Sequence, residues 1–140
     1  MGNSIVIDDG CKTYDIKNKQ GKLLCQFSFS PFDGGVVCRY KEVSKNLNNM
    51  ALNLENQKLS NEEKYKKAEK YIKEQYNYLF NADVDGSFFT VLSPLTVLPD
   101  GEIFAEKVME AIANVVNQET GIVLDKVKIR VGKYTNKYHG

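Results

Sequence analysis

Two amphipathic segments separated by a few polar residues constrain the fold of this chain more than any other feature. In the first segment, apolar side chains recur at alternating intervals of four and three residues, which is the spacing of one face of an α-helix. They form a stripe, called the seam below, that consists of Val36, Tyr40, Val43, Leu47, Met50 and Leu54. Such a stripe predicts a helix that buries one face against another surface.

The second segment opens with a helix-start signal. The sequence Ser60-Asn61-Glu62-Glu63 matches a capping box, in which Ser60 accepts from exposed backbone N–H groups and Glu63 reaches back. This predicts a helix over residues 61–80. Because residues 58–61 form a short connection, we expect an antiparallel helical hairpin over residues 36–80.

The seam admits two kinds of partner. A four-three spacing suits two helices of one chain, and it equally suits helices of different chains that interdigitate. The second helix of the hairpin favours the intramolecular arrangement, whereas contact with a second copy or with a partner protein stays open. Phe88, Phe89 and Leu92 are further apolar residues that would extend such a partner-binding surface.

Short strands are predicted at the N-terminal end. The β-branched residues Ile5, Val6 and Ile7 suggest a strand that ends at the turn signal Asp8-Asp9-Gly10. Residues 13–17 and 23–29 flank a polar segment, and apolar and polar residues alternate along the second of them. We therefore expect a β meander over residues 1–30 that includes one hairpin with one buried face.

The C-terminal half predicts a third helix and a last strand. Apolar residues at helical spacing indicate a helix within residues 100–120, with Asp100 as its cap and Gly121 as its stop. Val127, Ile129 and Val131 alternate with Lys128 and Arg130, which suggests a strand able to join the N-terminal sheet.

These elements predict an α+β fold of one domain over residues 1–140. In it, a small antiparallel N-terminal sheet packs with the helical hairpin and the third helix, and residues 122–140 form the last strand and a basic tail. The length of 140 residues and the 42% of hydrophobic residues suit a single core of this kind.

Charge and hydropathy exclude several classes of protein. Nineteen Lys and Arg against eighteen Asp and Glu leave a formal net charge of +1, so no strong field attracts nucleic acid or anionic lipid. No apolar run approaches the ~20 residues of a membrane helix, and residues 1–7 lack the pattern of an export signal. We expect a cytoplasmic protein that does not bind membranes, and the small net charge disfavours bulk electrostatic binding of nucleic acid.

Residues for catalysis or cofactor binding are not recognisable. His139 is the only histidine, and Cys11, Cys25 and Cys38 form no metal-binding pair. Cys25 alternates with apolar residues of the predicted hairpin, which indicates a core side chain. Neither a nucleotide-binding glycine motif nor a placed acid-base pair is evident. We therefore expect no catalytic residue, no cofactor and no enzyme activity.

A calcium loop is also excluded. Residues 81–86 carry oxygen-bearing side chains at alternate positions followed by Gly86, as such loops do. However, position one is Asn81, and position twelve, which should supply a bidentate Glu, is Leu92. We expect a turn that ends the preceding helix, and no metal site.

Positive charge gathers in residues 122–140. Five cationic residues stand there against Asp125 alone, and they are Lys126, Lys128, Arg130, Lys133 and Lys137. They form a possible basic surface for an acidic partner or a phosphate backbone. A solvent-facing strand edge with a basic tail explains them equally well.

The order of the predicted pieces resembles a family of small tail proteins from phages and prophages of Gram-positive bacteria. The resemblance rests on the N-terminal hairpin, the helix around Tyr40, the helix ending Tyr78-Leu79-Phe80, and three short motifs in the second half. These are Leu92-Ser93-Pro94-Leu95, Asp100-Gly101-Glu102-Ile103-Phe104 and Val108-Met109-Glu110-Ala111-Ile112.

The family resembles tail-assembly chaperones, which keep the tape-measure protein soluble while tail-tube subunits polymerise around it. The resemblance implies a non-enzymatic, chaperone-like assembly factor in the cytoplasm of the bacterial host. It would bind the tape-measure or tail-tube protein and self-associate as a homo-oligomer. Two alternatives remain: a phage-encoded binding or inhibitor module that contacts a host factor through the basic C-terminal segment, and a structural component of the virion.

Overall fold

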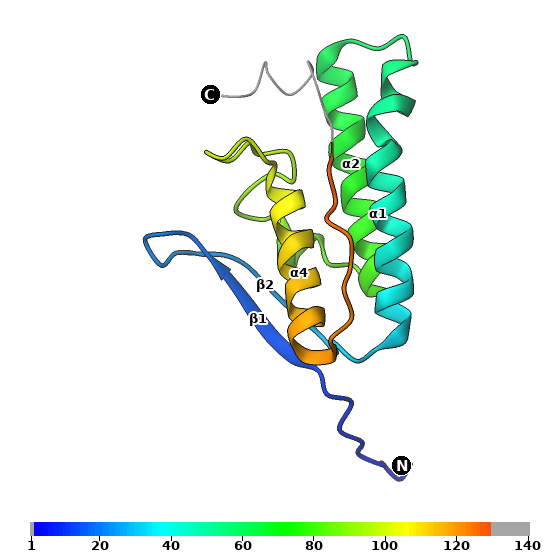
Figure 1. Cartoon of the computed structure of the whole chain (residues 1–140), viewed down its shortest axis with the longest axis vertical. Helices are drawn as coiled ribbons and strands as arrows, with labels where there is room; N and C mark the ends of the chain where they lie inside the picture. The colour runs from blue at the N-terminus through cyan, green and yellow to red at the C-terminus, as the bar shows by residue number, and fades with distance from the viewer. Residues whose placement is uncertain (1, 130–140) are drawn as a thin grey trace.

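The computed structural model describes residues 2–129 and has the predicted α+β fold. A hairpin of two strands is followed by four helices, one of them very short (Figure 1). In chain order the elements are β1 (Lys12–Lys17), β2 (Leu23–Phe29), α1 (Gly34–Glu55), α2 (Asn61–Phe80), α3 (Asp85–Phe88) and α4 (Phe104–Thr120). None of the helices among the described residues is long and apolar enough to cross a membrane.

The predicted β hairpin is confirmed. β1 and β2 pair antiparallel, with Tyr14 opposite Phe27 and an irregularity between Ile16 and Lys17. The alternation along β2 buries Cys25, Phe27 and Phe29, while Gln26 and Ser28 between them are exposed. The sheet therefore has one face on the core, as the period of two indicates.

The strand predicted at Ile5, Val6 and Ile7 is wrong. Residues 2–11 lie outside any helix or strand, and these three side chains are 88%, 93% and 80% exposed. The side chains of Asp8 and Asp9 accept from the backbone N–H groups of Gly10 and Cys11, in a turn that separates the triplet from β1. A β-branched run forms a strand only beside another strand, and the sheet in the described chain contains only β1 and β2.

The helical hairpin is also confirmed, and its ends have the expected caps. The side chain of Asp33 caps α1 by accepting from the backbone N–H of Gly35, and Ser60 caps α2 by accepting from that of Glu63. α2 ends at Asn81, which adopts the left-handed conformation with φ of 51°. α1 and α2 then run side by side (Figure 1).

The third predicted helix is α4, but the residue predicted to cap it is wrong. Ile103 occupies the cap position, and the side chain of Glu106 accepts from the Ile103 backbone N–H at 3.0 Å. Asp100 instead accepts from the backbone N–H of Glu102 in the preceding turn. The helix stops at Gly121, whose φ of 78° is the left-handed conformation that favours glycine.

The last predicted strand is wrong over its described part. Residues 122–129 are extended but pair with no strand, and they lie between α4 and the helical hairpin (Figure 1). Val127 and Ile129 are buried there, whereas Val131 lies outside the described residues. The backbone of this segment is hydrogen-bonded to a side chain instead of to a neighbouring strand: the side chain of Asn48 accepts from the Lys128 backbone N–H at 3.0 Å.

One apolar core connects all of these parts. It includes residues from β2, from the four helices and from residues 122–129. The buried hydroxyl of Tyr40 on α1 donates to the carbonyl of Asp125 at 3.2 Å, which ties the C-terminal segment to the helical hairpin. The hydroxyl of Tyr76 on α2 donates to the carbonyl of Ala105 at 2.7 Å, which ties α4 to it.

Candidate functional site

The seam lies inside the protein. All six of its residues are buried, and Val43 and Leu47 have no exposed surface. α2 covers the seam along the helical hairpin, and α4 and residues 122–129 contribute through Tyr40, whose hydroxyl contacts the carbonyls of Met109 and Asp125. The seam as a whole is therefore core in the folded chain and offers no continuous docking surface.

The apolar residues after α2 lie in an aromatic cluster. Phe88 is completely buried, with ring centroids 4.9 Å from Phe27 and 5.0 Å from Tyr76. Phe89 is half-buried against Tyr76, and Leu92 is half-buried on the edge of the core. These residues join α3 to the sheet and to α2, and they do not form an exposed patch.

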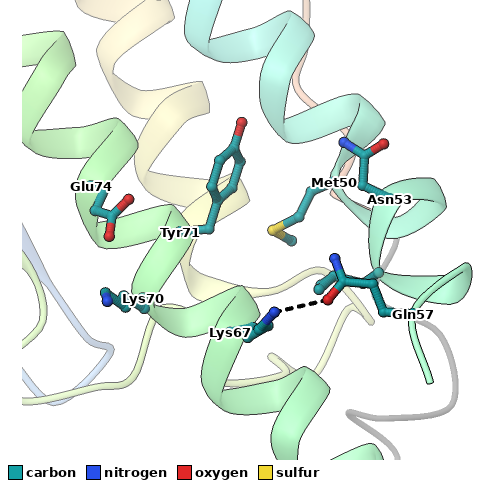
Figure 2. Close-up of a pocket in the computed structure, with 8 residues that line it drawn as sticks. Met50, Asn53, Gln57, Lys67, Lys70, Tyr71 and Glu74 are labelled. Atoms are coloured by element: carbon teal, nitrogen blue, oxygen red, sulfur yellow. Dashed lines mark hydrogen bonds between the residues drawn. The ribbon is translucent and has the colours of Figure 1, made fainter. Parts of the chain in front are cut away.

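The end of the seam does reach a groove between α1 and α2. Met50 lines it from α1 and Tyr71 from α2 (Figure 2). Leu54 of α1 lines it as well. Polar side chains also line it, and they are Asn53, Gln57, Lys67, Lys70 and Glu74. The groove has a volume of about 300 Å³.

The groove combines an apolar floor with a polar rim. Met50 and Tyr71 project from the two helices toward the same space, and Lys67 donates to the side chain of Gln57 at 2.9 Å (Figure 2). Burial and the nearby Glu74 raise the pKa of the Tyr71 hydroxyl, so this side chain remains uncharged at neutral pH. An apolar floor with an adaptable methionine suits the side chain of a docking helix.

A second apolar feature was not predicted as a site. Residues 2–10, called the arm below, carry the exposed triplet Ile5, Val6 and Ile7 away from the body of the protein (Figure 1). The sequence signal was present in the β-branched triplet, but it was interpreted as a strand of the sheet. An exposed apolar cluster of this kind is a candidate contact surface.

A cavity lies beside the base of the arm. It has a volume of about 410 Å³ and lies where the hairpin meets the start of α1 and the end of α2. Its lining includes Cys11, Phe29, Phe32, Val36, Arg39 and Phe80. Phe32 is 68% exposed, so part of the apolar wall faces solvent.

The predicted basic surface is described only in part. Lys126 pairs with Glu102 at 2.8 Å, and Lys128 is exposed. The other three residues lie outside the described part of the chain, and they are Arg130, Lys133 and Lys137. Hydrogen bonding to Glu102 raises the pKa of Lys126, and the partner lysines Lys126 and Lys107 lower the pKa of Glu102. The ammonium group of Lys126 is thus already paired with a carboxylate of the same chain.

The titratable groups in the core have structural roles. Burial raises the pKa of the Cys25 thiol to about 11, so Cys25 is not a thiolate nucleophile at neutral pH. Burial also raises the pKa of Glu106, which accepts backbone hydrogen bonds from Ile103 and Ile129. Within residues 2–129, no three His, Cys, Asp or Glu side chains cluster in a way that would hold a metal ion.

Comparisons of the chain with protein-family models, with curated proteins and with solved structures found no match.

Proposed function

We propose that this protein is a non-enzymatic phage tail-assembly factor that binds a helix of the tape-measure or tail-tube protein in the groove between α1 and α2. The observation that carries the proposal is the arrangement of Met50, Leu54 and Tyr71 around an open groove of about 300 Å³. The resemblance to tail-assembly chaperones directs the proposal to tail proteins as partners.

The groove suits an apolar helix that must be held and later released. Met50 has several rotatable bonds and a polarisable sulfur, so its side chain can adapt to different apolar residues. The rim carries Lys67, Lys70 and Glu74, which offer polar contacts around the apolar floor. A small apolar anchor with a polar rim supports transient binding rather than a permanent interface.

The proposal is tested by co-expression with the tape-measure protein of the same phage or prophage. Asn53 lines the groove and its side chain is exposed, so Asn53→Trp should fill the groove without removing a core contact. We expect the wild-type chain to increase the soluble fraction of the tape-measure protein and the variant to lose most of this effect. The matched control is Asn49→Trp, at an exposed position on the same helix outside the lining of the groove.

Three results would contradict parts of the proposal. A wild-type chain that leaves the solubility of both tail partners unchanged would rule out the assembly role. Equal effects of Asn53→Trp and wild type would place the contact elsewhere. Stoichiometric presence of the protein in purified particles would assign it to the virion structure instead.

A further inference from the structure

The arm presents apolar side chains that no residue of the described part of the chain covers. Ile5, Val6 and Ile7 are 80–93% exposed among the described residues, whereas the core residues of the same types are almost completely buried. The turns at Asp8 and Asp9 fix the direction in which the arm leaves the sheet. These turns order the base of the arm, and the triplet beyond them extends into solvent.

The cavity beside the base of the arm has one apolar wall. Phe29, Phe32, Val36 and Phe80 form its apolar wall, and its volume of about 410 Å³ falls within the ~300–1,000 Å³ of protein binding pockets. The triplet of the same chain does not line the cavity, because Asp9 is the only arm residue that does. The triplet and the cavity thus lie on one chain, but the triplet does not contact the cavity of its own chain.

We propose that two copies of this chain form a dimer by exchanging arms, so that the apolar triplet of each copy fills the cavity of the other. A two-fold axis near the base of the arm generates both contacts at once, as an isologous interface requires. This inference rests on the arm and its cavity, and it is independent of the groove between α1 and α2.

The reach of the arm fits this arrangement. An extended chain advances about 3.3 Å per residue, so the triplet lies about 10–17 Å along the chain from Gly10. Because the cavity is lined by Asp9 and Cys11 at the base of the arm, a second copy joined near Gly10 brings its own cavity within that distance.

The lining of the cavity also carries charge, from Asp9, Asp33 and Arg39. Arg39 lines the cavity, and one of its N–H groups donates to the carbonyl of Leu79 at 2.9 Å. Arg39 has no ion pair within residues 2–129, and its guanidinium has further N–H donors. Asp8 directly follows the triplet, so an arm that enters the cavity adds a carboxylate to the two already present, and the remaining N–H donors of Arg39 are its available partner.

The test compares the solution mass of three full-length chains across concentration by sedimentation equilibrium. The first is the wild type, which we expect to be a dimer. The second replaces the triplet with Ile5→Ser, Val6→Ser and Ile7→Ser, and the third carries Phe32→Ser in the cavity wall. We expect each change to raise the dimer dissociation constant by about a hundredfold or more, because each removes an apolar anchor from both contacts.

All of the changed residues are largely exposed in the isolated chain, so both variants should keep the wild-type circular dichroism spectrum and melting temperature. The matched control is Leu52→Ser, at a 63% exposed apolar position on α1, which should leave the dimer intact. A mixture of the two variants gives the sharpest result. Its heterodimer keeps one complete arm-and-cavity contact, so the variants should associate with each other more strongly than either does with itself.

Several outcomes would overturn the inference. A wild-type monomer at every concentration would show that the arm does not join two copies, including the case in which it folds back onto its own chain. A triplet variant that dimerises like the wild type would remove the arm from the interface. A Phe32→Ser variant that dimerises normally, or variants that do not complement each other, would show that the arm binds outside this cavity.

Discussion

Replacing Leu47 by Ala tests whether the seam is core or contact surface. Leu47 lies in the middle of the seam on α1 and has no exposed surface. Burial of a whole leucine side chain is worth about 1.5–3 kcal/mol, and the cavity left by truncation adds to the loss. We therefore expect Leu47→Ala to lower the free energy of unfolding by about 2–5 kcal/mol, a large share of the ~5–15 kcal/mol typical of a domain.

Leu52→Ala provides the matched control on the same helix. Its side chain is 63% exposed, so truncation removes little buried surface, and alanine has at least the helix propensity of leucine. We expect a change within about 0.5 kcal/mol. The two substitutions are chemically identical, and only the position of the leucine differs.

Urea unfolding of the purified chain, followed by circular dichroism, measures both variants. With a slope of about 2 kcal/mol per molar urea, a loss of about 3 kcal/mol lowers the unfolding midpoint by about 1.5 M. A small shift for Leu47→Ala, similar to that of Leu52→Ala, would refute the assignment of the seam to the core. Such a result would instead indicate that the seam is an open interface.

Two further substitutions test the polar groups of the core. Tyr76→Phe removes the buried hydroxyl that donates to the carbonyl of Ala105, so we expect a loss of about 1–3 kcal/mol in urea unfolding; no loss would contradict that hydrogen bond. Glu106→Gln tests the raised pKa of Glu106. The free energy of unfolding of the wild type should fall as pH rises from the ordinary glutamate pKa through the raised native pKa, because the folded state holds the proton more tightly. The free energy of unfolding of the variant should depend less on pH over this range. Equal pH dependence of the two midpoints would contradict that assignment.

Local signals in the sequence predicted the helices well. Ser60 and Glu63 fix the start of α2, Gly121 fixes the end of α4, and the seam spacing fixes the inner face of α1. The alternation along β2 fixed the buried face of the hairpin in the same way. Each of these features depends on residues within about one turn or one strand of one another, so the sequence contains the needed information.

The errors lie where the outcome depends on distant parts of the chain. The triplet in the arm has the composition of a strand, but strand formation requires a free edge in the right place. Val127 and Ile129 alternate like strand residues, yet they pack beside helices, and the side chains of Asn48 and Glu106 accept from the backbone N–H groups of Lys128 and Ile129. The groove and the cavity also depend on tertiary packing, so neither was predictable from the spacing of residues.

The two helices of the hairpin are longer than α4. α1 has 22 residues and α4 has 17, so at about 1.5 Å per residue α1 is longer by about 8 Å. α4 lies beside the end of the helical hairpin that contains Tyr40, and the opposite end extends beyond it (Figure 1). Among the described residues, the lining of the groove comes from α1, from α2 and from Gln57 just after α1, so at this end the helical hairpin itself covers the seam, and Met50 and Leu54 form the floor of the groove with only 3% and 6% of their surfaces exposed.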